Sequence, residues 1–190
     1  MIPLHAVRPA SVPAPTRTPK RTGVRDAHIR AAEILGRIID VFETVESCSD
    51  ETLDVARTLL AGELEGIGIA QTRAPHGSKG RSAVLTAAAQ CVHAAWVERS
   101  AGRPSAGADG ASFEGTPDAV PGERHTEAWQ VLYRVYRVLD GVAGFHDRVP
   151  PSRQAGVVDV LAHMLQGPEP RTWRLDQRAL ARCVLEWMRG

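Results

Sequence analysis

Apolar residues recur at helical spacing along most of this chain, and no stretch alternates as a β-strand would. From Ala31 to Val45 the main apolar positions follow one another at steps of four, three, four and three residues. This spacing places them on one face of a helix. The same spacing returns from Ala128 to Val142. The pattern predicts an all-α protein with six helices, near residues 24–47, 50–68, 82–98, 124–143, 151–166 and 176–189.

Residues at the edges of these stretches predict helix starts and buried faces. Ser49, Ser82 and Asp176 each stand beside a predicted start, where a short polar side chain acts as an N-cap. Trp129 adjoins the apolar face of the fourth helix, and Trp187 continues that of the sixth. We therefore expect both tryptophans to be largely buried. The pair His146–Asp147 falls outside the predicted helices and is expected in a loop.

Two stretches of different composition divide the chain. Residues 1–23 are rich in proline and basic side chains, and residues 99–123 consist mainly of glycine, serine, alanine and proline. Such compositions favour flexible segments over packed structure. Residues 8–25 in particular are expected to have no stable structure of their own. The sequence thus predicts a flexible arm, a three-helix unit at 24–98, a linker, and a second three-helix unit at 124–190.

The two predicted units resemble each other. Aligning residues 31–45 with 128–142 gives five identities, and one of them, Arg37 with Arg134, lies off the apolar face. The third helices of the two units share the motif AxCV. Unrelated helices with the same apolar spacing also share such residues, so duplication and convergence both stay open. A duplication predicts that the two units pack with approximate two-fold symmetry.

Composition narrows the setting of the protein. The formal net charge is +1, which predicts no strong attraction of the whole molecule to nucleic acid or membrane. The three cysteines form no CxxC pair, so neither a disulfide framework nor a zinc site is expected, and a reducing cytoplasm is the expected location. No apolar run approaches the roughly 18 residues of a membrane span. Arginine far outnumbers lysine and asparagine is missing, which is typical of a GC-rich bacterial or phage genome.

No motif in the sequence points to catalysis. There is no HExxH, no GxSxG and no phosphate-binding loop of the GxxxxGK[ST] type. We therefore predict that the chain is not an enzyme, and we predict no catalytic, cofactor-binding or metal-binding residue.

Two basic clusters are the candidate binding residues, one in the arm and one at the last helix. They are Arg8, Arg17, Lys20, Arg21, Arg25, Arg171, Arg174, Arg178 and Arg182. The leading hypothesis is a non-enzymatic adaptor or modulator that binds another protein through a groove between the two units or through the arm. The alternative is a nucleic-acid-binding regulator that uses the same arginines. The sequence predicts no oligomeric state.

Overall fold

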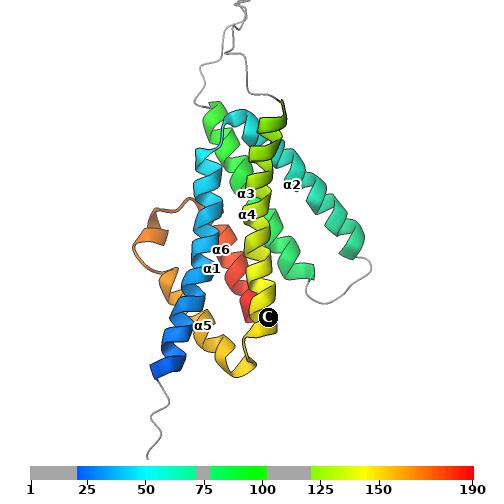
Figure 1. The fold of residues 1–190 in the computed structure, drawn as a ribbon. Helices are drawn as coiled ribbons and strands as arrows, with labels where there is room; N and C mark the ends of the chain where they lie inside the picture. The colour runs from blue at the N-terminus through cyan, green and yellow to red at the C-terminus, as the bar shows by residue number, and fades with distance from the viewer. Residues whose placement is uncertain (1–20, 72–77, 102–120) are drawn as a thin grey trace, which may run out of the picture.

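A computed structural model describes residues 21–71, 78–101 and 121–190 of the chain. In these residues it contains six α-helices and one short 3-10 helix, without any strand (Figure 1). The elements are α1 (Arg21–Ser47), α2 (Asp50–Gln71), α3 (Ser78–Ala101), α4 (Pro121–Arg148), α5 (Pro151–Met164), η1 (Glu169–Thr172) and α6 (Leu175–Arg189). The predicted all-α fold is therefore confirmed for the described part of the chain.

Several helices are longer than the apolar pattern predicts. Helix α1 begins at Arg21, so residues 21–25 are helical and the expectation of an unstructured segment there is wrong. Helix α4 starts at a proline and ends just before Val149 and Pro150, and it includes His146, which was expected in a loop. Proline is tolerated in the first turn of a helix but cannot continue one. Prolines rather than the ends of the apolar face therefore set the limits of α4.

The helix starts only partly match the prediction. Ser49 caps α2 as expected, because its Oγ accepts a hydrogen bond from the backbone N–H of Thr52 at 3.2 Å. Helix α3 begins at Ser78, before the predicted cap Ser82, which lies inside the helix. At α6 the backbone N–H of Arg174 donates to Oε1 of Gln177 at 2.9 Å, so Asp176 lies in the first turn instead of capping it.

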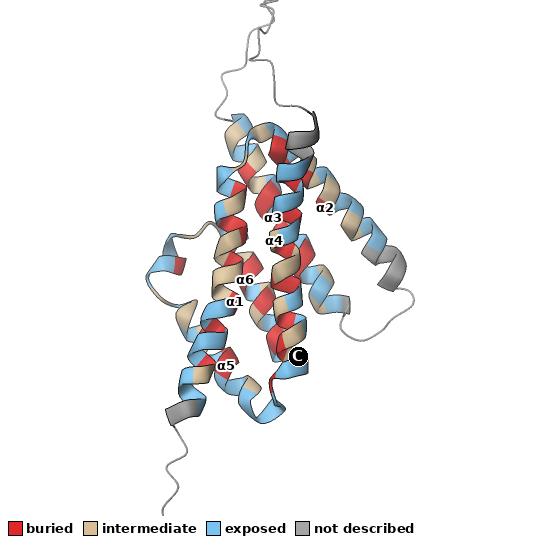
Figure 2. Ribbon diagram, viewed as in Figure 1, coloured by how far each residue is buried: buried red, intermediate tan, exposed pale blue. Residues whose placement is uncertain are grey.

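All six helices contribute to a single hydrophobic core, and their buried faces meet at the centre of the bundle (Figure 2). In α1 most of the predicted apolar positions are buried, with Ile38 and Val41 at 0% exposure, while Leu35 is partly buried. In α4 the matching positions Val135 and Val138 are 1% exposed. The spacing of apolar residues therefore predicted correctly which faces of these two helices are buried.

Trp129 does not follow that prediction, because 51% of it is exposed. It follows the buried Ala128 directly, and successive residues point about 100° apart around a helix. Its neighbour one turn along the helix, Tyr133, is 57% exposed, so the two aromatic side chains share the outer face of α4. Trp187 is only partly buried; it packs against the core at its edge and lies so close to Gly80 that a Cβ there would come within 2.2 Å.

The helices pack mainly across the two halves of the chain. Helix α1 runs along α4, and α3 packs along α6. In addition, α1 contacts α5 of the other half while α4 contacts α2. Exchanging the two halves leaves this set of contacts unchanged, which is the arrangement that two-fold related halves produce. The division into two units stays a prediction, since most of the packing joins one half to the other.

Two polar contacts between α1 and α4 lie at matching positions of the two halves. The sequence alignment pairs residues 97 positions apart. Arg37 Nη1 donates to the backbone carbonyl of Arg137 at 3.0 Å, and the matching contact joins Arg134 to the carboxylate of Asp40 at 3.8 Å. Both contacts link one arginine of the aligned pair to the same position on the opposite helix. Polar contacts between α1 and α4 therefore recur at matching positions of the two halves, with a backbone carbonyl as the partner in one and a carboxylate in the other. The internal duplication stays a prediction.

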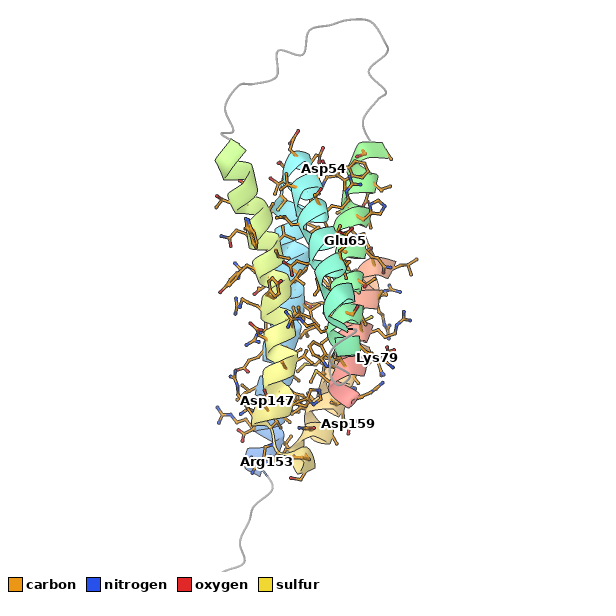
Figure 3. The ribbon with its side chains drawn as sticks, turned by 90° about the vertical axis from the view of Figure 1, so that its right-hand side faces the viewer. Asp54, Glu65, Lys79, Asp147, Arg153 and Asp159 are labelled. Atoms are coloured by element: carbon orange, nitrogen blue, oxygen red, sulfur yellow. The ribbon has the colours of Figure 1, made fainter. Side chains whose placement is uncertain are left out.

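The connection between α4 and α5 lies at one end of the bundle, and the first part of α2 lies at the other. In Figure 3, Asp147 near the end of α4 and Arg153 near the start of α5 lie at one end, with Asp54 of α2 at the other. The segment between α5 and α6, which holds η1, stands out to one side of the bundle and is drawn in orange in Figure 1. This segment forms one wall of a groove on the surface of the bundle.

Candidate interaction groove

A groove of about 590 Å³ lies between α5, η1 and α6. We call it the α6 groove. It is lined by Ala162, Leu165, Gln166, Pro170, Arg171, Trp173, Arg178, Ala181, Arg182, Leu185 and Arg189. It combines an apolar floor with exposed arginines at its edges. It lies within the second predicted unit and not between the two units.

The path of the chain between α5 and α6 explains why a groove exists here. In the first half α2 and α3 pack along each other, whereas the matching helices α5 and α6 touch much less. Helix α5 ends at Met164, and the chain then passes through Pro168 and Pro170 before α6 starts. Trp173 packs edge-on against Phe42 of α1, with ring centroids 5.1 Å apart. This contact holds the segment against the bundle.

The charge of the groove has one sign. Among the described residues that line it there are four arginines and neither aspartate nor glutamate. The guanidinium of Arg178 donates to the backbone carbonyl of Arg171 across the groove edge, which fixes its position. Arg182 is largely exposed and lies 4.0 Å from Glu186, a spacing that leaves the pair weak. The groove therefore presents positive charge around apolar side chains.

Arg174 has a different place from the other arginines near α6. Its Nη1 lies 2.8 Å from Oε2 of Glu98 near the end of α3, and its Nε lies 3.5 Å from the carboxylate of Asp176. The side chain thus ties the start of α6 to α3, and it does not line the groove. Of the four candidate arginines of this cluster, the structure brings three together.

The other candidate cluster is that of the N-terminal arm. Arg8, Arg17 and Lys20 lie outside the described residues. Arg21 is the first residue of α1, and Arg25 is exposed in the same helix, away from the residues that line the groove. Their expected contact with an acidic surface stays a prediction.

Sequence reasoning missed the apolar half of the groove. Leu185 lies off the main apolar face of α6, and Trp173 precedes the helix. A large apolar residue off the buried face is a signal that could have marked Leu185. Nothing in the sequence indicates how far α5 and α6 stand apart, and that distance determines whether the groove forms.

The cysteines are poor candidates for nucleophilic chemistry. Burial raises the pKa of the Cys91 thiol well above its ordinary value, and the nearby carboxylate of Asp176 raises it further. Burial also raises the pKa of Cys48 and of Cys183. A thiol attacks as its thiolate, so all three are held in the less reactive form near neutral pH.

The described residues offer neither a metal centre nor a membrane span. No group of three or more His, Cys, Asp or Glu side chains is arranged among them to hold a metal ion. None of the described helices combines the length and the apolar character needed to cross a membrane.

Comparisons with known proteins identify no relative of this chain. The chain matches no model of a protein family, and no significant match appears among curated proteins or among solved structures. The residues of this chain are therefore the only basis for inferring its function.

Proposed function

We propose that this chain is a non-enzymatic helical adaptor or modulator that binds a partner protein in the α6 groove. The observation that carries the proposal is the groove itself, whose described lining residues include four arginines and no carboxylate around apolar side chains. Its volume of about 590 Å³ is within the range of about 300–1,000 Å³ that is typical of ligand pockets.

The chemistry of the groove selects the kind of partner. Arginine binds carboxylates in a planar, two-pronged geometry, and an apolar floor favours side chains such as leucine or phenylalanine. An amphipathic helix lays its apolar face into such a groove and keeps its charged side chains at the rim. The occupant that fits is an acidic amphipathic segment of another protein.

We place this activity in the cytoplasm of a bacterium or of a phage-infected cell. The free cysteines of the described chain fit a reducing compartment, and the arginine-rich composition fits a GC-rich genome. The arm residues Arg8, Arg17, Lys20 and Arg21 would then supply a second contact with the same partner.

A nucleic-acid-binding role is the alternative, and the continuity of the basic surface favours it. Arg182 also lines a neighbouring cleft between α3 and α6, together with Lys79. Phosphate contacts would make binding strongly dependent on salt, because each one adds about −0.9 to the slope of log affinity against log salt. A protein complex held by apolar contacts would depend on salt far less.

The test compares capture of partners from the native cell by three forms of the full chain. Arg182→Glu reverses a charge at the groove, and Arg153→Glu reverses one on an exposed position of α5 away from it. After nuclease treatment, we expect the wild type and Arg153→Glu to retain a protein with an acidic segment. Arg182→Glu should retain at least about tenfold less of it, equivalent to about 1.4 kcal/mol.

Two results would contradict the proposal. Loss of all bound material on nuclease treatment would favour the nucleic-acid alternative. Equal capture of the same proteins by all three forms would show that the α6 groove is not the binding site.

A further inference from the structure

A second cleft, lined mainly by α1 and the end of α4, gathers four arginines. Its volume is about 260 Å³. Arg30 and Arg37 come from α1, and Arg137 and Arg148 come from α4. We call it the arginine cleft. It lies on other elements than the α6 groove and shares no lining residue with it.

Two glycines of α4 let the guanidinium groups lie directly on the helix backbone. A Cβ added to Gly141 would stand 2.3 Å from Nη1 of Arg37, and one added to Gly144 would stand 3.0 Å from Nη2 of Arg148. Arg37 also donates from Nη1 to the carbonyl of Arg137 at 3.0 Å. Arg37 is therefore held in place by the backbone before any ligand arrives, which lowers the entropic cost of binding.

The arginines of this cleft are not neutralised by its own carboxylates. Glu33 and Asp140 also line it, which leaves two more positive than negative charges. Among the described residues, neither carboxylate lies within ion-pair distance of a cleft arginine. Of the four cleft arginines, Arg137 has an acidic partner within the described chain, Asp40 at 3.6 Å, which lies outside the cleft lining. The other three guanidinium groups line one small cleft without a carboxylate partner among the described residues.

The other half of the chain supplies an internal comparison. A cleft of about 280 Å³ lies at the matching positions of the other half and is lined by Thr44, Ser47, Cys48, Glu127, Gln130 and Arg134. Each of these residues matches a residue of the arginine cleft 97 positions away in number. The alignment pairs Glu127 with Arg30, and Thr44 with Gly141. Similar helix packing therefore occurs without the positive charge, so packing alone does not require these arginines.

We propose that the arginine cleft binds a small divalent oxyanion, such as a phosphate group or a dicarboxylate. Guanidinium groups recognise both through paired, charge-assisted hydrogen bonds. A divalent anion balances the two excess positive charges of the cleft, which a monovalent anion balances only in part.

The test uses the full chain and two probes, inorganic phosphate and succinate, each titrated against chloride at matched pH and ionic strength. Calorimetry gives the affinity, and the backbone amide signals of Gly141 and Gly144 in NMR spectra report the place of binding. We expect one of the probes to bind and to shift both glycine signals. Phosphate and succinate distinguish the two sources of the oxyanion.

A double variant and a matched control test the residues. Arg30→Gln with Arg148→Gln removes two exposed cleft arginines, and it should weaken binding of the preferred probe at least about tenfold. Arg81→Gln with Lys79→Gln removes the same charge from exposed positions of α3 outside the cleft and should leave the affinity within about twofold. Gly141→Thr, which copies the other half, should displace Arg37 and also weaken binding, with circular dichroism checking that the helices are intact.

Three results would overturn the proposal. They are no binding of either probe beyond that of chloride, binding that leaves the two glycine signals unmoved, and equal weakening in both double variants. None of these results bears on the α6 groove, so the two proposals can fail separately.

Discussion

Cys91 shows how strongly the core acts on a single titratable side chain. It is 1% exposed, on the part of α3 that packs against α6. Burial is the main cause that raises its pKa, and the nearby carboxylate of Asp176 is the next. The unfolded chain has no such surroundings, so its thiol titrates near the ordinary value of 9.0. The native and unfolded states therefore bind different numbers of protons in alkaline solution.

The stability of the protein should consequently fall above about pH 9 in a way that depends on Cys91. Below the unfolded pKa both states keep the proton, and this residue adds no pH dependence. Above it only the unfolded state releases the proton, which lowers the free energy of unfolding by up to about 1.4 kcal/mol per pH unit. Urea unfolding at about pH 8, 9 and 10 measures this slope.

The control is Cys91→Ala, which will be less stable at every pH but should have a shallower slope above about pH 9. The difference between the two slopes isolates this thiol from every other titrating group, including Cys48 and Cys183. Parallel slopes would mean that the thiol of Cys91 loses its proton equally readily in both states.

At the scale of the helix, side chains of α4 that are close in sequence differ strongly in how far they are buried. Leu132 is 1% exposed, whereas Trp129, three residues before it, is half exposed. Leu132→Ala should lower the free energy of unfolding by about 2–5 kcal/mol, because it leaves a cavity in the core. Trp129→Ala should lower it by clearly less, about 1 kcal/mol, because about half of this side chain is already in water. Chemical denaturation of both variants checks the contrast.

A large loss of stability in Trp129→Ala would contradict the exposed position of this ring. If Trp129→Ala instead has only the small expected effect on stability and weakens binding of a partner, the outer face of α4 would join the binding surface. Tyr133→Ala, one turn along the same face, is the matched variant for that comparison.

The helices themselves could be predicted from sequence because each buried face repeats along the chain. The same rule fails where a feature depends on one residue or on a distance between elements. Trp129 follows a buried residue in the sequence, but its side chain lies on the outer face of α4. The α6 groove depends on how far Pro168 and Pro170 hold α6 from α5, and the arginine cleft depends on α1 and α4 lying side by side. Residues 100 positions apart, such as Arg37 and Arg137, give no local signal of their contact.

At the scale of the molecule, the two halves depend on each other for their buried surfaces. Helix α1 covers α4 and α5, and α2 covers α4, so each half supplies a wall of the other's core. A fragment with one half alone leaves its apolar faces in water, which removes the main force that favours folding. Neither half should therefore fold as a stable monomer.

Separate expression of residues 21–101 and 121–190 tests this dependence. Each fragment alone should show no cooperative thermal unfolding as a monomer, and an equimolar mixture should recover helical circular dichroism and a cooperative transition. Size-exclusion chromatography of the mixture should show one copy of each fragment. Cooperative unfolding of the first fragment alone as a monomer would show that it is an independent domain.

Matching positions of the two halves are separate residues of one polypeptide, so each can change without the other. The two clefts between α1 and α4 contain such a pair of positions. In an assembly of identical subunits every substitution appears twice, so a symmetric pair of sites must stay alike. Here one position of the pair is Arg30 and the other is Glu127. In this single chain the charge at each position can change by itself, so the two clefts need not carry the same charge.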